Sequence, residues 1–265
     1  MPEIIEGTPI LWRERDLIYS NDSKLDEYLK KTGATKISRQ GFCYNEDIFN
    51  NKHESRGKKV IIIASSYIGS IHDTPQIKKL VAELIAHFES GEAMTDEILD
   101  RFSKSSGFNK ETIFYDFWHF VVREISVQWL CELADNIEVE VYGRYWEKNS
   151  VVKPFFKGEI PHGPKVAKLY NSALYTLVPH PFDLGSQRLA EASSCGSIPI
   201  VYDCRQPSQN IPWENSCLWY RTKEDLRSCI SKLPTKPVEQ ICEGKSYSSF
   251  ARRILDEIDK AIANQ

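Results

Sequence analysis

The second half of the chain alternates short apolar segments with amphipathic helical segments, and this alternation constrains the fold more than any other feature. Strands followed by helices of about ten to fifteen residues require right-handed crossovers, which place the strands parallel in one sheet. The sequence therefore predicts an α/β fold with a doubly wound parallel sheet. The expected strands are 137–143, 154–160, 174–179 and 198–203, and the expected helices are 164–173, 186–195 and 223–233.

A continuous β-branched segment, KKVIIIASSY at 58–67, precedes this alternation. Such a segment is typical of a strand buried on both faces of a parallel sheet, so we expect it to open the main domain, residues 58–245. Residues 75–135 are predicted to be helical, with Pro75 in the first turn of one helix and Thr95 as a cap of the next. The aromatic residues Phe114, Phe117, Trp118 and Phe120 are spaced like a buried helix face, and core packing is the expected role.

The two ends of the chain differ from this central part. Residues 1–57 contain an expected strand at 16–20, a helix at 23–31, a strand at 35–42 and then a polar linker. We interpret them as a short β-α-β remnant of a second domain, because so few residues do not build a complete one. Residues 246–265 form an amphipathic pattern that predicts a C-terminal helix.

Charge and cysteine content exclude several classes of protein. The chain has 265 residues, with 34 Lys and Arg against 37 Asp and Glu, and such a balance predicts no nucleic-acid partner. It has no apolar segment of the roughly 20 residues that span a bilayer and no recognisable signal peptide. The seven cysteines form no C-x-x-C pair, so we expect reduced thiols in a cytoplasmic protein without a transmembrane segment.

The segment LVPHPFDLGSQRLAEASSCGSIPIVY at 177–202 is the candidate site. Ligands of open parallel sheets bind beyond the carboxyl ends of the strands, where loops meet helix N-termini. Ser186 is the expected N-cap, which leaves the amides of Gln187 and Arg188 pointing out of the helix. Free amides, the helix dipole and the Arg188 guanidinium together favour phosphate binding.

Two carboxylates flank this turn, and they require a different partner. Asp183 precedes the helix, and Glu191 lies three residues after Arg188 on the same face. A carboxylate beside a phosphate site suits sugar hydroxyls, so a ribose diol is a natural partner for Glu191. The structural alternatives are a surface ion pair between Arg188 and Glu191, a simple cap at Ser186 and a turn closed by Asp183.

The motifs in this part of the chain resemble the donor-binding half of a GT-B glycosyltransferase, which has a Rossmann-like fold. LYNS, LVP, LGSQR and EASSCGSIPIV, with IPWENS after them, are similar to exostosin-type enzymes. VEVYGRYW, FFKGEI and KLYNSA are similar to group 1, spore-maturation-type enzymes. The likeness covers about residues 137–220, and Asp183 with Glu191 matches an E-x7-E pattern whose first position is Asp here.

The resemblance implies a role for each matching residue. Glu191 would bind the donor ribose, Asp183 would contact the transferred sugar, and Arg188 would act on the departing diphosphate. Donor-binding positions are Gly185, Ser186 and Gln187 at the diphosphate, Gly143 and Arg144 at the mouth of a strand, and the backbone from Gly158 to Ile160 at the nucleobase. Lys157 and His162 could flank the nucleotide, and a solvated loop is the alternative.

Two further groups are candidates from their positions at strand ends. His180 could contact the donor phosphate or act in proton transfer, and a structural histidine is the alternative. Ser65, Ser66 and Tyr67 end the first strand of the main domain, so we expect them to line the cleft where the acceptor enters.

The predicted function is transfer of a sugar, hexosyl-like, from a nucleotide-sugar donor of UDP or GDP type to a hydroxyl of a glycan or other acceptor. The resemblance implies no cofactor and no metal, and it implies that the missing N-terminal acceptor domain is a partner of this chain. A catalytically silent nucleotide-sugar-binding module is the alternative. A dehydrogenase or epimerase would need a glycine fingerprint, which IIIASSYIGS lacks. Transfer with retention of the anomeric configuration fits the spacing of Asp183 and Glu191, whereas transfer with inversion fits the resemblance to exostosin-type enzymes.

Overall fold

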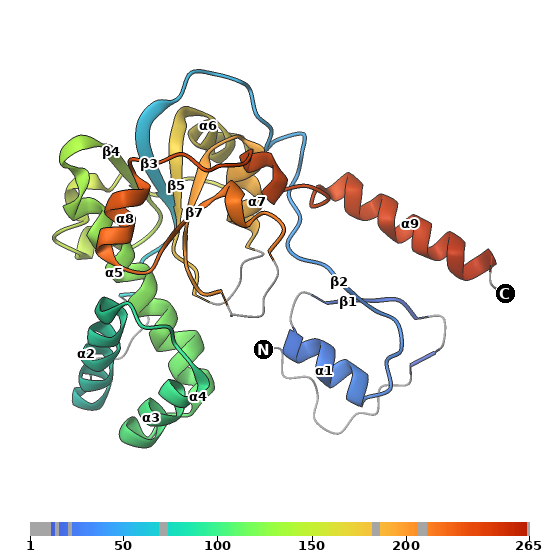
Figure 1. Ribbon diagram of the computed structural model, residues 1–265, viewed down its shortest axis with the longest axis horizontal. Helices are drawn as coiled ribbons and strands as arrows, with labels where there is room; N and C mark the ends of the chain where they lie inside the picture. Colours follow the sequence, from blue (N-terminus) through green and yellow to red (C-terminus); the bar gives the residue numbers. More distant parts are fainter. Residues whose placement is uncertain are drawn as a thin grey trace.

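The computed structural model describes residues 12, 13, 16–20, 23–68, 74–181, 186–205 and 211–263. Its centre is a five-stranded parallel sheet with the strand order β4-β3-β5-β6-β7 (Figure 1). The neighbours of β3 are the next two strands in the chain, so the order reverses between β3 and β5, as in a doubly wound sheet. This confirms the predicted fold class. The strands are β3 (Gly57–Ile63), β4 (Glu138–Tyr142), β5 (Ala173–Val178), β6 (Ile198–Tyr202) and β7 (Leu218–Tyr220).

Side chains of β3 alternate between two cores, one on each face of the sheet. Val60 and Ile62 pack with α2, α5 and α8, whereas Ile61 packs with α6 and α7. All three side chains are fully buried, which explains the continuous apolar run in this strand. The helices are α2 (Pro75–Ser90), α3 (Asp96–Ser106), α4 (Lys110–Thr112), α5 (His119–Glu132), α6 (Pro164–Ser172), α7 (Gln187–Ser194) and α8 (Lys223–Cys229).

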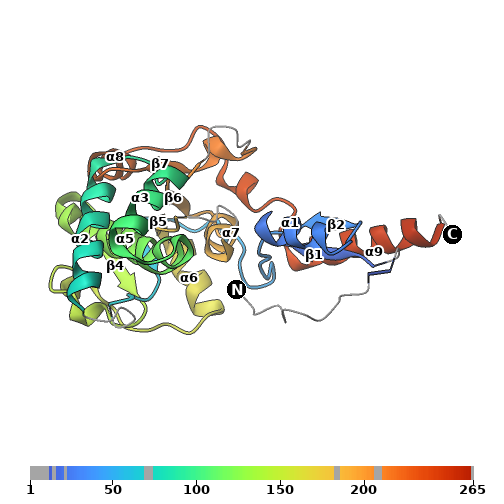
Figure 2. The ribbon, with the colours of Figure 1, turned by 90° about the horizontal axis from the view of Figure 1, so that it is seen from below.

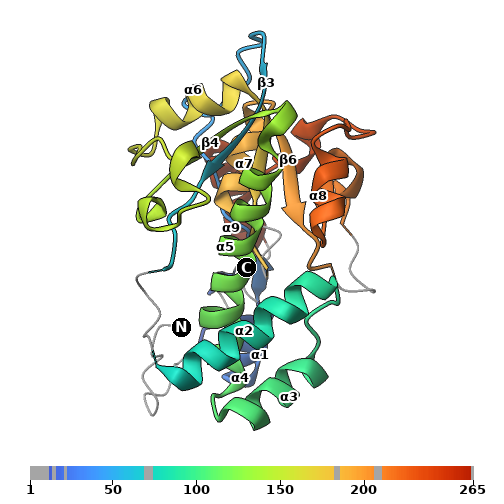
Figure 3. The same ribbon diagram turned by 90° about the vertical axis from the view of Figure 1, so that its left-hand side faces the viewer.

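A helical insertion between β3 and β4 extends beyond the edge of the sheet. Figure 3 shows α2, α3 and α4 gathered at one end of the long α5. Thr74 and Thr95 cap α2 and α3 by accepting from the amides of Ile77 and Ile98, as predicted for Thr95. A π-helical segment, Ile113–Trp118, joins α4 to α5 and carries Phe114, Phe117 and Trp118, of which the last two are buried. Phe120 lies in the first turn of α5 and is half-buried.

One predicted strand, 154–160, is wrong. Residues Lys153–Phe155 form a 3-10 turn, and Phe156 makes an isolated bridge to Val141. Pro154 lacks the amide that a strand ladder needs, and Gly158 has a positive φ of 90°, so the segment cannot continue as a strand. Strand β7 was not predicted, because its three residues are too few to show a period.

The N-terminal β-α-β unit lies beside the C-terminal helix. Strands β1 (Ile18–Ser20) and β2 (Ile37–Arg39) pair in parallel around α1 (Ser23–Lys31), and α9 (Tyr247–Ala263) extends away from the main sheet toward them (Figures 1 and 2). The Tyr19 hydroxyl donates to Glu257 at 2.6 Å, and its ring meets that of Phe250 edge-on at 5.2 Å between centroids. Strand β1 and helix α9, which lie far apart in the sequence, are therefore packed together.

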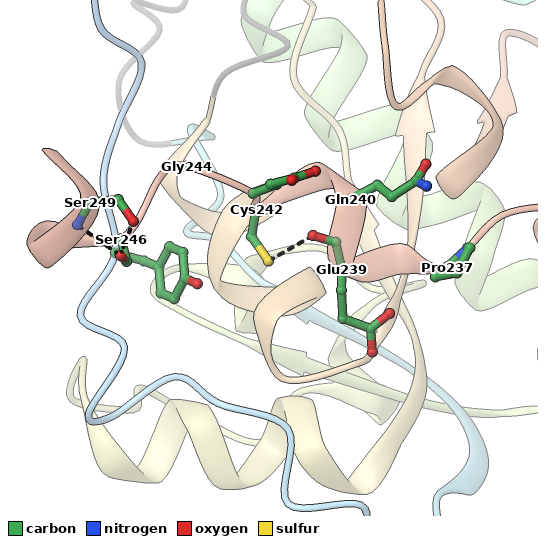
Figure 4. Close-up of a pocket in the computed structure, with 9 residues that line it drawn as sticks. Pro237, Glu239, Gln240, Cys242, Gly244, Ser246 and Ser249 are labelled. Atoms are coloured by element: carbon green, nitrogen blue, oxygen red, sulfur yellow. Dashed lines mark hydrogen bonds between the residues drawn. The ribbon is translucent and has the colours of Figure 1, made fainter. Parts of the chain in front are cut away.

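Two segments connect this unit to the main sheet, and they run side by side at Tyr44 and at 245–247. The Tyr44 amide donates to the Lys245 carbonyl at 3.1 Å, and the Tyr247 amide donates to the Tyr44 carbonyl at 3.0 Å. Glu46 accepts from the amides of Tyr247 and Ser248 at the start of α9. A cavity of about 330 Å³ lies at this crossing (Figure 4), lined by Tyr44, Pro237, Glu239, Gln240, Cys242, Glu243, Gly244, Ser246 and Ser249.

None of the helices in the described part of the chain combines the length and the apolar character needed to cross a membrane.

Candidate active site

The site is built where β3, β5, α5 and α7 meet at the carboxyl edge of the sheet. Ser65 and Tyr67 follow β3, and His180 follows β5. His119 and Arg123 lie four residues apart on α5, so both side chains are on one face of that helix. The strand order reverses between β3 and β5, so these residues stand at the topological switch point.

Arg123 is the central residue of this cluster. It is only 5% exposed, and its guanidinium lies 4.2 Å from the centroid of the Tyr67 ring. Nη2 donates to His119 Nε2 at 2.9 Å and Nη1 donates to the Ser65 carbonyl at 3.3 Å. Within the described part of the chain, no carboxylate oxygen lies within 4.0 Å of this guanidinium. Among the described residues, the groups in contact with this guanidinium are therefore neutral, an arrangement that favours an anionic ligand.

Two histidines beside Arg123 are held in their neutral form. The rings of His119 and His180 are 5.0 Å apart between centroids. Burial, followed by the charge of Arg123, lowers the pKa of His119 to about 3 and that of His180 to about 4. Because an arginine can only donate, the hydrogen bond from Arg123 also requires an unprotonated Nε2 on His119.

The start of α7 adds further positive potential. Ser186 Oγ accepts from the Leu189 amide at 3.3 Å, which confirms Ser186 as the N-cap. Arg188 is exposed, and its charge contributes to the lowered pKa values of His119, His180 and Arg123. Arg188 therefore acts on the same region as Arg123, although it lies on a different helix.

Glu191 lies beneath this surface with two partners. Its side chain is 2% exposed, and Oε1 makes hydrogen bonds to His162 Nε2 at 2.6 Å and to Gln187 Nε2 at 2.8 Å. Burial raises the pKa of Glu191, and the contact with His162 opposes this rise. The surface ion pair between Arg188 and Glu191, one of the structural alternatives, is absent among the ion pairs of the described residues. His162 also contacts Phe49, with ring centroids 5.2 Å apart.

The predicted residues after β4 have structural partners. A Cβ on Gly143 would lie 2.3 Å from the Ala64 carbonyl oxygen, and the Gly143 amide donates to the Gly158 carbonyl at 3.1 Å. Arg144 is exposed and forms an ion pair with Glu159 at 2.8 Å. The three remaining positions differ in exposure, since Lys157 is exposed, Gly158 is half-buried and Ile160 packs on the core that contains Phe49.

Two predicted residues, Asp183 and Gly185, lie outside the described residues. The structure brings His180, Ser186, Arg188 and Tyr67 toward one region and places Glu191 with Gln187 beside it.

Sequence reasoning missed three residues of the site, Arg123, His119 and Glu124. The Oε1 atom of Glu124 accepts a hydrogen bond from the Tyr67 amide at 2.8 Å. The spacing in WHFVVRE, with His119 and Arg123 on one helix face, was the available signal. Among the described residues, no group of three or more His, Cys, Asp or Glu side chains is arranged to hold a metal ion.

The doubly wound parallel sheet is that of the C-terminal domain of a GT-B glycosyltransferase. The model of the glycosyl transferase-like family matches residues 123–257, just over half of the chain. The chain therefore belongs to the glycosyl transferase-like family. No curated protein matches it in sequence.

One solved structure shares this fold at low sequence identity, and two further structures are similar over most of this chain. Sucrose-phosphate synthase from Thermosynechococcus elongatus is similar with a TM-score of 0.53 and 12% identity, over 94% of this chain and 59% of that one. TarM is similar with a TM-score of 0.49 and 14% identity, over 91% of this chain and 43% of that one. The pneumococcal O-GlcNAc transferase GtfA, solved with UDP and GlcNAc, has a TM-score of 0.47 and 12% identity, over 93% of this chain and 45% of that one. The chain thus spans about half the length of these structures.

Proposed function

We propose that this chain binds the diphosphate of a nucleotide-sugar donor between Arg123, Arg188 and the N-terminus of α7, and transfers the sugar to an acceptor hydroxyl. The observation that carries the proposal is the burial of Arg123 without a carboxylate partner among the described residues. A diphosphate would supply the missing negative charge and accept the unused donors of both arginines.

Catalysis would then be mainly electrostatic. Charge develops on the departing diphosphate as the bond to the sugar breaks, and fixed donors in a water-poor site stabilise that charge. Arg123 is already held in place by Ser65, His119 and Tyr67, so little reorganisation would be needed. We propose that the positive charge of these protein groups is sufficient to stabilise the departing diphosphate and that the transfer proceeds without a metal.

The histidines would assist as neutral groups. With a pKa of about 4, His180 is a weak base near neutral pH, so we propose that it hydrogen-bonds the donor rather than storing the acceptor proton. The base for an inverting reaction would come from the acceptor domain. Asp183 remains our proposed contact to the transferred sugar, and both stereochemical outcomes stay open.

The ribose would bind at Glu191. Its carboxylate is covered by His162, whose side chain is 62% exposed and can rotate into solvent more readily than a buried group. We propose that the ribose hydroxyls replace His162 on Glu191, with Gln187 remaining in place. A UDP- or GDP-type donor and an exostosin-like reaction are further proposals from the sequence resemblance. A cytoplasmic location is a further proposal from the cysteine pattern.

Donor binding is the measurement that tests this function. We expect UDP or GDP at about a hundredfold its dissociation constant to stabilise the chain by about 2.7 kcal/mol, which raises Tm by several degrees. Arg123→Gln should abolish most of this rise, because a hydrogen-bonded charge is lost from the site. Arg101→Gln, an exposed arginine on α3, is the matched control and should bind like the wild type.

The silent-module alternative predicts the same binding without turnover. Release of UDP or GDP from their sugar conjugates, with water or simple glycosides as acceptors, separates the two functions. Binding without any release in the presence of the acceptor domain would favour the module. Absence of binding by a folded wild-type chain would contradict both.

A further inference from the structure

A second cavity lies next to the cationic cluster, at the carboxyl ends of β6 and β7. Its volume is about 550 Å³, within the range of small-molecule sites. Two pairs of consecutive residues connect it to the cluster, since Trp118 precedes His119 and Pro181 follows His180. Its lining residues are Ala93, Met94, Thr95, Phe114, Trp118, Pro181, Tyr202, Asp203, Cys204, Arg205, Glu214 and Arg221.

One wall of this cavity is apolar and comes from the helical insertion. Phe114 and Trp118 lie on the π-helical segment Ile113–Trp118, and Met94 precedes α3. Single π-helical turns inside longer helices occur often at functional sites, because they change the direction in which side chains point. Here the π-helical segment presents Phe114 to the cavity, while the following helix presents His119 and Arg123 to the cationic cluster.

The remaining part of the lining is polar, and the charges of its described residues cancel. Asp203 pairs with Arg205 at 2.8 Å and with Arg221 at 3.5 Å, and Arg205 also pairs with Glu214. Among the described lining residues, two carboxylates and two guanidinium groups therefore face the cavity, with no net charge. Arg205 is further fixed by the Trp219 ring, 4.3 Å from its guanidinium carbon. This wall offers many hydrogen-bond donors and acceptors but does not select for an ionic ligand.

We propose that this cavity is an acceptor subsite that binds one uncharged sugar residue. A sugar has an apolar face of C–H groups, which suits Phe114, and hydroxyls that both donate and accept, which suit Asp203 and Arg205. The neighbouring cluster has the net positive charge that a diphosphate requires, whereas this cavity is electrically balanced. The inference rests on the proposed transferase function and names the chemistry of the acceptor.

Direct binding of simple glycosides tests the subsite. The probes are the methyl glycosides of glucose, galactose, mannose and N-acetylglucosamine, titrated against the full chain by ligand-observed NMR with and without UDP. We expect at least one probe to bind in the millimolar range and to remain bound when UDP is added. Phe114→Ala and Glu214→Gln should each lower the affinity for that probe by about threefold to tenfold. Tyr145→Ala, an exposed aromatic residue outside the cavity, should have no effect.

The two variants keep the test informative if one of them unfolds, because Glu214 is half exposed and its replacement does not alter the apolar core. UDP affinity should be unchanged in both variants, which separates failure of this subsite from failure of the donor site. If no probe binds wild type, the acceptor subsite is contradicted. If Phe114→Ala lowers the affinity for a UDP-sugar but not for UDP, the cavity holds the donor sugar instead and the proposal is wrong.

Discussion

At the residue scale, the main finding is how the environment sets the charge of individual groups. Arg123 keeps its charge although it is buried, because a guanidinium does not deprotonate in proteins. The nearby imidazoles respond in the opposite way and lose their protons, since burial and the arginine both disfavour imidazolium. The cluster therefore has its positive charge on arginines alone, and that charge does not vary over the physiological pH range.

The two histidines predict a loss of stability in acid. In the unfolded chain they titrate near 6.5, whereas in the fold their pKa values are about 3 for His119 and about 4 for His180. Between about pH 6.5 and pH 4 the unfolded state binds more protons, so the free energy of unfolding falls as pH decreases. Each histidine contributes a slope of up to about 1.4 kcal/mol per pH unit.

Urea denaturation at several pH values measures this effect. His180→Asn should reduce the loss of stability between pH 6.5 and pH 4 by about 1–3 kcal/mol. His53→Asn changes an exposed histidine and is the matched control, with the acid dependence of wild type expected. An unchanged pH profile in His180→Asn would show that His180 is not the acid-sensitive group.

The Glu191 pair gives a second prediction at this scale. His162→Ala should expose the carboxylate and remove the hydrogen bond that opposes the rise in its pKa. If the ribose replaces His162, this variant should bind UDP at least as tightly as wild type, whereas Glu191→Ala should bind it at least tenfold more weakly. Isothermal titration with UDP measures both affinities. Weaker binding in His162→Ala than in wild type would place His162 among the donor contacts.

At the element scale, the close approach of two strand ends depends on one glycine. The end of β4 lies so near β3 that a Cβ on Gly143 would contact the Ala64 carbonyl oxygen at 2.3 Å. Gly158 also has a positive φ, but no atom lies within 4 Å of its Cβ position. Comparing substitutions at Gly143 and Gly158 therefore separates the effect of steric overlap on stability from the effect of backbone strain.

We expect Gly143→Ala to destabilise the chain by about 2–4 kcal/mol, because the β3 and β4 ends must separate. Gly158→Ala should cost about 1 kcal/mol, as expected for a strained backbone alone. Chemical denaturation of both variants gives the comparison. Equal losses would show that the loop after β4 relaxes and that the overlap is avoided.

At the scale of the whole molecule, β1, α1, β2 and α9 form a unit apart from the main sheet. Helix α9 leaves the sheet at the crossing of Tyr44 with Lys245 and packs on β1 through Phe250 and Glu257. A two-stranded sheet with one short helix buries little apolar surface, so we expect this unit to depend on α9.

Phe250→Ser should loosen the N-terminal unit while leaving donor binding intact. We expect a stability loss of about 1–3 kcal/mol and faster hydrogen exchange in β1 and β2, because the contact with Tyr19 is lost. Leu255→Ser, at a side chain that is 61% exposed, is the control and should exchange like wild type. Exchange that rises equally throughout the main sheet would contradict the separation of the two units.

Local patterns were sufficient for most elements but not for the segment after β4. The caps at Thr95 and Ser186 were predictable because a cap involves neighbouring residues only. The strand expected at 154–160 failed because its apolar letters match a strand, while Pro154 and the positive φ of Gly158 prevent a ladder. The glycine at 143 was predicted as a donor contact, whereas the structure also shows it in a tight backbone approach that no local pattern reveals.

The sequence by itself determined the parallel α/β fold, the cap at the start of α7 and the candidate turn that contains Arg188, because periodicity, capping and turn chemistry act over a few residues. Only the tertiary structure decided that Arg123 lies with His119 and Tyr67, that Glu191 is covered by His162 and that Phe114 lines a second cavity. These facts depend on burial and on contacts between residues far apart in the chain. Such contacts are set by how the helices pack on the two faces of the sheet.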